Sequence, residues 1–291
     1  MTGLRAPELA VAAGDGHRWA MPARIPAAPT AALLWLPALG VAAKHYLPFA
    51  EALASRGVAC FLHEWRGAGS STVRAGRGCD WGYRELLEHD LPAAEAAVDR
   101  ALPGVARILG GHSLGGQLAC CRLALAPESA HTLWLVASGA PYWRAFPART
   151  RWWLPMAYRF LPWLADRVGA LPGRRIGFGG REARGVIGDW ARTALSGRYA
   201  ARGVATDLEA ALRRLRIGTR AVVFADDWLA PESSLRFLLS KMPAAATRIL
   251  RLDAAALGTR PDHFSWLARP QAVVAALTAR DRGGSAPAYI G

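Results

Sequence analysis

The chain has 291 residues, of which 52% are hydrophobic and 20% are charged. This length and composition exclude intrinsic disorder and allow a large buried core without disulfide or metal staples. Lysine and arginine outnumber aspartate and glutamate by 36 to 22, which gives a net charge of +14. Such a charge is typical of proteins that bind nucleic acids or anionic membranes. However, the basic residues are almost all arginine and no block of five like charges occurs, so the charge alone decides nothing.

Short apolar runs alternate with longer stretches of helical character, which predicts an α/β fold: a mostly parallel central sheet with helices on both faces. In chain order, the expected elements are strands at 31–36 and 58–63 with a helix at 46–55 between them, a helix at 91–101, a strand at 106–109, a helix at 117–125, strands at 132–137, 220–224 and 247–252, and a last helix at 270–280.

The alternation stops between residues 139 and 215, where no strand is predicted. This segment holds five of the twelve tryptophans, and its 14 arginines against 5 acids carry +9 of the net charge. We expect a helical cap or lid inserted into the sheet domain; the alternative is a helical layer whose tryptophans only pack on the sheet. The expected organisation is a core of residues 1–138 and 216–282, a cap at 139–215 and a flexible Gly/Ser/Ala/Pro-rich tail at 283–291.

Cysteine usage and the N-terminus bear on the compartment. The four cysteines show no C-x-x-C spacing and are expected to be reduced thiols. The N-terminus has no signal-peptide layout. The apolar stretch 31–43 is too short to span a bilayer and contains Pro37 and Gly40. We therefore expect a cytoplasmic protein without a transmembrane segment.

The most informative motif is Gly111-His112-Ser113-Leu114-Gly115, a G-x-S-x-G between a predicted strand and a predicted helix. That context is required for a nucleophile elbow. The turn is so sharp that Ser113 must take a strained backbone conformation, and side chains at positions 111 and 115 would collide with the strand and the helix. The serine hydroxyl then stands at the carboxyl end of the sheet, where open α/β sheets bind ligands.

A serine nucleophile needs a base and an acid that orients the base, in the chain order Ser, Asp or Glu, His. Two acids, Asp226 and Asp227, follow the strand predicted at 220–224; Asp227 is preferred because it lies further into the loop. His263 is the only histidine after them. The expected catalytic residues are therefore Ser113, Asp227 and His263, with Asp226 as the alternative acid.

These segments resemble the α/β-hydrolase superfamily, in particular its serine-hydrolase branch of serine aminopeptidase-like and lysophospholipase-like proteins. The stretch from Trp65 to Ser71 is similar to the R-G-x-G-x-S turn that follows the fourth strand of that fold. The acid segment Asp227-x-x-x-Pro231 and the base segment His263-Phe264 are similar as well. The resemblance covers about residues 31–137 and 215–280, and the cap is not recognisable from it.

The oxyanion loop departs from the family pattern. Relatives often carry His-Gly after the third strand, whereas this chain has Pro37-Ala38-Leu39-Gly40. The chemistry needs two backbone N–H donors, one from the residue after the nucleophile and one from this loop. Leu114 is expected to supply the first and Leu39 the second, with Ala38 as the alternative.

The expected function is a serine hydrolase that cleaves carboxylic esters through an acyl-enzyme. The alternatives are acyl transfer by the same triad and a non-catalytic binding protein on a hydrolase scaffold. The cap tryptophans favour a small-molecule ester with an apolar acyl group, and the cap arginines either meet an anionic part of the substrate or only face solvent. No metal cluster, P-loop or dinucleotide motif is found, so no cofactor or metal is implied, and a nucleic-acid partner is disfavoured.

Overall fold

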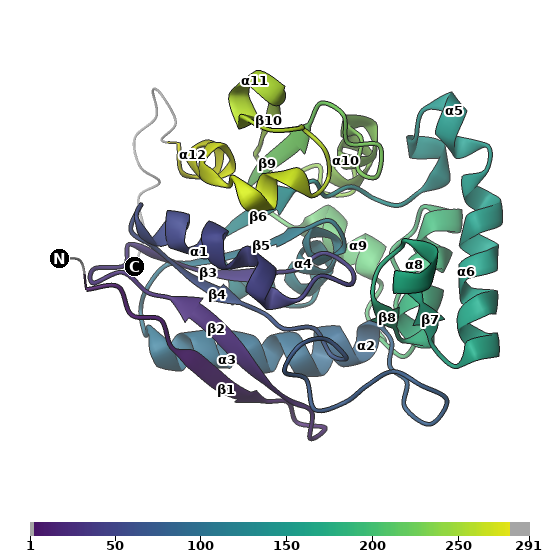
Figure 1. Cartoon of the computed structure of the whole chain (residues 1–291), viewed down its shortest axis with the longest axis horizontal. Helices are drawn as coiled ribbons and strands as arrows, with labels where there is room; N and C mark the ends of the chain where they lie inside the picture. The colour runs from purple at the N-terminus through teal and green to yellow at the C-terminus, as the bar shows by residue number, and fades with distance from the viewer. Residues whose placement is uncertain (1–2, 280–291) are drawn as a thin grey trace.

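A sheet of eight strands runs through the computed structural model, which describes residues 3–279 (Figure 1). The strands lie in the order β1-β2-β4-β3-β5-β6-β9-β10. From β4 to β10 every neighbouring pair is parallel, whereas β1 pairs with β2, and β2 with β4, in antiparallel fashion. The strands are β1 Glu8–Ala12, β2 Arg18–Arg24, β3 Ala31–Leu36, β4 Val58–Leu62, β5 Arg107–His112, β6 Thr132–Val136, β9 Gly218–Phe224 and β10 Thr247–Leu252.

Helices cover both faces of this sheet, which confirms the predicted fold class. They are α1 Leu47–Ala54, α2 Tyr83–Glu85, α3 Leu91–Ala101, α4 Leu114–Leu125, α5 Ala148–Arg151, α6 Leu154–Val168, α7 Gly173–Ile176, α8 Arg184–Ser196, α9 Leu208–Arg214, α10 Glu232–Leu239, α11 Ala254–Leu257 and α12 Gln271–Thr278. Helices α1 and α12 pack on one face, and α3, α4 and α9 pack on the other (Figure 1).

The central strands are apolar on both faces because both faces are covered. Along β3, Leu33 and Trp35 point into the core that contains α1 and α12, whereas Leu34 and Leu36 point into the core that contains α3 and α4. This is the two-residue period of a strand.

The structure also corrects the predicted elements. An N-terminal hairpin, β1 and β2, was not predicted, although Trp19 and Met21 alternate inward along β2; Pro22 masks that pattern because proline is uncommon inside a strand. The expectation of no strand within residues 139–215 was wrong, since β7 Leu171–Pro172 and β8 Arg181–Glu182 form an antiparallel pair. Strands of two residues are too short to show a period.

Two predicted elements, the strand at 106–109 and the last helix, end at other residues in the structure. The strand expected at 106–109 continues to His112, because Gly110 fits where a Cβ would approach the Trp134 carbonyl oxygen to 2.9 Å. The helix expected at 270–280 is α12, which ends at Thr278; residue 280 and the tail expected at 283–291 lie outside the described residues.

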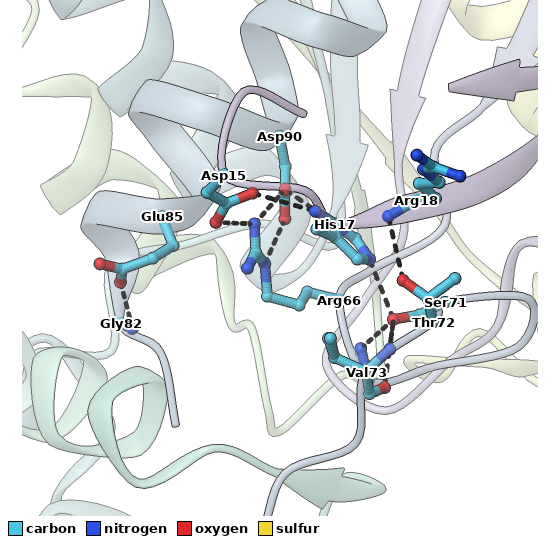
Figure 2. Close-up of polar contacts among 11 residues, drawn as sticks. Asp15, His17, Arg18, Arg66, Ser71, Thr72, Val73, Gly82, Glu85 and Asp90 are labelled. Carbon is cyan, nitrogen blue, oxygen red and sulfur yellow. Dashed lines mark hydrogen bonds and ion pairs between the residues drawn. The ribbon is translucent and has the colours of Figure 1, made fainter. Parts of the chain in front are cut away.

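A buried polar network fastens the N-terminal hairpin to the core (Figure 2). His17 Nδ1 lies 2.9 Å from Asp90 Oδ1, and His17 Nε2 lies 2.9 Å from the Ser71 hydroxyl. Arg66 donates two hydrogen bonds to Asp90 and forms an ion pair with Asp15 at 2.8 Å. Burial alone would raise the pKa of Asp90, but the hydrogen bonds from His17 and Arg66 outweigh it and lower that pKa.

Candidate active site

Ser113 occupies the turn between β5 and α4 at the centre of the sheet. Its backbone has φ 54° and ψ −119°, a left-handed conformation that non-glycine residues rarely adopt. A Cβ at position 111 would lie 2.3 Å from the Gly115 carbonyl carbon, and a Cβ at position 115 would lie 2.0 Å from the Leu36 carbonyl oxygen. Glycine is therefore required on both sides of this serine, as the sequence motif predicts.

Asp227 and His263 meet across two loops at the carboxyl end of the sheet. The Nδ1 atom of His263 lies 2.7 Å from Asp227 Oδ2, and both side chains are buried. The other oxygen of this carboxylate, Oδ1, accepts hydrogen bonds from the N–H groups of Leu229 and Ala230, both at 2.9 Å. The carboxylate is thus held on both oxygens and presents one of them to the imidazole.

The neighbouring acid, Asp226, lies differently. Its side chain is exposed, and its backbone N–H donates to the Pro261 carbonyl at 3.0 Å, which ties the acid loop to the histidine loop. Of the two carboxylates considered in the sequence, only Asp227 is paired with His263 among the described residues.

The loop after β3 offers two candidate oxyanion donors, and one of them is already engaged. The Ala38 N–H donates to the Tyr46 hydroxyl at 2.9 Å. By contrast, the N–H groups of Leu39 and Leu114 have no hydrogen-bond partner in the described part of the chain. The geometry therefore favours Leu39 over Ala38 as the free donor of this loop.

Tyr46 is a residue that the sequence analysis missed. Its hydroxyl is also 2.9 Å from Nδ1 of His112, the residue before Ser113, so one phenol joins the oxyanion loop to the nucleophile elbow. Burial raises the pKa of Tyr46 and, with His263 nearby, lowers the pKa of His112 well below its usual value. Both side chains are therefore neutral, and the phenol can donate to His112. No local pattern marks Tyr46, because its partners are distant in sequence.

A cavity of about 640 Å³ opens over Ser113 and His263. Residues from the inserted segment (139–215) supply much of its wall, and most of the wall is apolar: Phe146, Trp153, Leu154, Ala157, Tyr158, Phe160, Leu161, Ile176, Phe178 and Trp190, with Trp228 and Phe264 from the core. Gln117, one helical turn after Ser113, is the other buried polar side chain of the wall, and its Oε1 has no partner among the described residues.

The inserted segment also touches the oxyanion loop directly. Gly40 has φ +74°, and a Cβ there would lie 2.2 Å from the Gly180 backbone nitrogen. The backbone of residues 179–180 therefore packs against the backbone of Gly40. In Figure 1, α6 to α8 lie beside the sheet at the end where β5 runs into α4.

No arginine or lysine lines this cavity among residues 3–279. Two arginines of the inserted segment have partners elsewhere: Arg184 faces Asp80 at 3.6 Å, and Arg181 Nε donates to the Ala75 carbonyl at 2.7 Å. Direct contact of these arginines with an anionic group in the cavity therefore has no support in the geometry.

Comparison with known proteins gives one family and many similar folds. Residues 27–182, more than half of the chain, match the family described as serine aminopeptidase S33. No curated protein matches the chain significantly.

Several solved structures are similar to this one. DcsB in complex with its substrate analogue has a TM-score of 0.63 at 15% identity, covering 94% of this chain and 97% of that one. A hydrolase from Pseudomonas aeruginosa PA01 has a TM-score of 0.56 at 22% identity, covering 95% and 99%. The N-formylmaleamic acid deformylase of Pseudomonas putida S16 has a TM-score of 0.57 at 18% identity, covering 94% and 100%. With TM-scores above 0.5, these structures share the fold of this chain.

Proposed function

The chain belongs to the serine aminopeptidase S33 family of α/β-hydrolases, and on that basis we propose that it is a serine hydrolase that cleaves carboxylic esters. The observation that carries the proposal is the buried Asp227–His263 pair at 2.7 Å, which shares a cavity with Ser113 on its strained turn. A hydrogen bond from His263 Nδ1 to Asp227 leaves Nε2 as the basic nitrogen.

The reaction proceeds in two halves. Ser113 Oγ attacks the ester carbonyl carbon while His263 Nε2 accepts its proton, and the N–H groups of Leu39 and Leu114 hold the oxyanion. Collapse of the tetrahedral intermediate breaks the bond to the alcohol, which leaves with the proton from His263. A water molecule then attacks the acyl-serine by the same route, and the free acid and Ser113 are released.

The wall of the cavity favours a neutral, apolar acyl group. The volume of the cavity lies within the range of about 300–1,000 Å³ that is typical of small-molecule sites, and aromatic and aliphatic side chains dominate the wall. We assign residues 139–215 the role of a cap that supplies this wall and excludes water.

An aminopeptidase reaction is less favoured by the same wall. A peptide N-terminus would bring an ammonium group into the cavity, yet no aspartate or glutamate lines it within residues 3–279. A buried charge without a partner is costly.

The four cysteines are unpaired thiols, which supports the cytoplasm as the compartment.

The test is a panel of esters of varied acyl length and charge, assayed with wild type and single variants. Ser113→Ala should lower kcat by at least about 10³-fold with an unchanged melting temperature. Asp227→Asn should lower kcat by about 10⁴-fold, because the amide NH2 group would donate to His263 Nδ1 and hold the imidazole in the wrong tautomer. The matched control Asp226→Asn should leave kcat unchanged.

Two results would reject the proposal. Near-full activity of Ser113→Ala would exclude this serine as the nucleophile, and an absence of labelling of wild type by a fluorophosphonate would exclude an active site of this kind. If an added alcohol captures the acyl group at the expense of hydrolysis, acyl transfer replaces hydrolysis as the reaction.

A further inference from the structure

Helix α6 carries an apolar face that points away from the core. Met156, Phe160 and Trp163 are at least half exposed, and at 100° per residue they fall with Arg167 within roughly 60° of the helix circumference. We call these four residues the α6 outer face. The opposite side of the helix, including Leu154, Tyr158 and Leu161, is buried against the rest of the molecule.

Exposed apolar side chains are concentrated around this face. Of nine large hydrophobic side chains exposed among residues 3–279, six belong to the segment 139–215 and two more, Trp228 and Phe264, line the cavity. The ninth, Leu4, is close in sequence to the N-terminus, and Figure 1 marks that end of the chain on the opposite side of the view from α6. Exposed apolar side chains gathered in one segment, here called the patch, are typical of an interaction surface.

Arginines surround the same patch. Residues 144–181 contain eight arginines, all exposed, against one acid, Asp166, which gives this stretch a net charge of +7. Two of these arginines lie close to tryptophan rings: Arg167 is 5.8 Å from the centre of the exposed Trp163 ring, and Arg144 is 4.8 Å from the centre of the half-buried Trp143 ring. Aromatic and arginine side chains side by side are typical of helices that lie at a membrane interface.

We propose that the α6 outer face docks on an anionic lipid surface, with α6 lying in the plane of the interface. The charge favours this partner over a second copy of the chain, because face-to-face dimerisation would bring two stretches of +7 together. No helix in the described part of the chain is long and apolar enough to cross a bilayer, so docking is peripheral.

The patch continues into the cavity. Phe160, which belongs to the α6 outer face, and Ile176 are both exposed, and both line the cavity. A docked molecule therefore opens its active site next to the lipid. Together with the proposed function, on which this point rests, the geometry assigns the enzyme an ester substrate with an acyl chain drawn from that surface.

The experiment is sedimentation with vesicles of phosphatidylcholine, with and without about one third phosphatidylglycerol. Wild type should bind the anionic vesicles, and binding should weaken as salt is raised. The double variant Met156→Ser/Trp163→Ser should bind at least about tenfold more weakly. Arg159→Gln and Arg167→Gln should each weaken binding about fivefold. Neither Met156 nor Trp163 lines the cavity, so turnover of a water-soluble ester by the double variant should stay at the wild-type level.

Matched controls separate this surface from general charge and hydrophobicity. Leu4→Ser and Arg5→Gln change an exposed leucine and an exposed arginine close in sequence to the N-terminus and should bind like wild type. Ser113→Ala should also bind like wild type, so a failure of the catalytic proposal leaves the binding result intact.

Three outcomes would overturn the docking proposal. The first is no binding of wild type to anionic vesicles at low salt. The second is equal binding by wild type and the double variant. The third is self-association without lipid that the double variant abolishes, which would make a second copy the occupant of the face.

Discussion

Replacing Tyr46 by phenylalanine removes one oxygen atom and separates two parts of the proposed catalytic machinery. The hydroxyl accepts from the Ala38 N–H and lies 2.9 Å from His112 Nδ1, both in surroundings closed to water. Phenylalanine fills the same space, so no large cavity forms. The substitution therefore reports on the two hydrogen bonds alone.

The size of the effect follows from the two groups left behind. A buried polar group without a partner costs about 1–3 kcal/mol, so two of them should lower the free energy of unfolding by about 3 kcal/mol. For a chain of 291 residues the entropy of unfolding is about 0.6 kcal/mol/K, so the melting temperature should fall by about 5 °C. Since Ala38 precedes the proposed donor Leu39, a looser loop should also lower kcat by about 10–100-fold with little change in KM, short of the loss of a whole donor.

The assay is steady-state turnover of a soluble ester well below the melting temperature, alongside thermal unfolding. Leu91→Ala is the stability control, because Leu91 is fully buried on α3 and does not line the cavity; it should lose about 3–5 kcal/mol without a fall in kcat. A Tyr46→Phe protein that melts earlier but keeps the wild-type kcat would refute the link between this phenol and the oxyanion loop.

Three other outcomes follow from the structure. Gly115→Ala should lower the free energy of unfolding by about 3 kcal/mol and reduce turnover, since its Cβ would lie 2.0 Å from the Leu36 carbonyl oxygen. The control Gly78→Ala places its Cβ with no atom within 4 Å and should change neither quantity. Equal melting temperatures of the two variants would contradict the steric argument. Ala157→Leu should lower kcat/KM about tenfold for long acyl esters and spare acetyl esters, because it fills the cavity wall; a uniform loss would argue against an acyl site. The lowered pKa of Asp90 stabilises the fold above its unfolded pKa of about 4, and this contribution is lost as pH falls through the folded pKa, so denaturant melts from pH 6 to about 2.5 should show an acid-dependent loss that Asp90→Asn lacks. Parallel curves for the two proteins would count against it.

The sequence predicts the parts of this molecule whose signals are local. Strands 31–36 and 247–252 match the structure residue for residue. The first is an unbroken apolar run, which reflects burial on both faces of the sheet, whereas the second is an edge strand that is mostly exposed or half-buried. The turn at Ser113 was predictable because glycine at 111 avoids the backbone of residues 115 and 116 in the same turn, although glycine at 115 is required by the distant Leu36 carbonyl. His263 pairs with Asp227, and the contacts that hold this carboxylate come from the N–H groups of Leu229 and Ala230; the catalytic role of the pair stays a prediction.

Other features depend on contacts between distant segments and have no local signal. The Tyr46 hydroxyl joins Ala38, which is 8 positions before it in the chain, to His112, which is 66 positions after it. The approach of Gly40 to Gly180 joins the oxyanion loop to the inserted segment across 140 residues. That the arginines of the inserted segment lie outside the cavity could not be predicted from the sequence, since their number says nothing about which way their side chains point.

The hairpin network of Figure 2 bears on how catalytic sites are recognised. Ser71, His17 and Asp90 form a hydrogen-bonded row with both distances at 2.9 Å, the same residue types that we assign to catalysis elsewhere in the chain. Yet Ser71 is buried, and its hydroxyl is also engaged by the backbone of Gly67 and Val73. Serine, histidine and aspartate joined by hydrogen bonds therefore do not by themselves mark a catalytic site in this protein. What separates the two sets of side chains is a serine with an open side toward a cavity, so a serine-directed reagent should modify one residue of the chain and leave the hairpin row untouched.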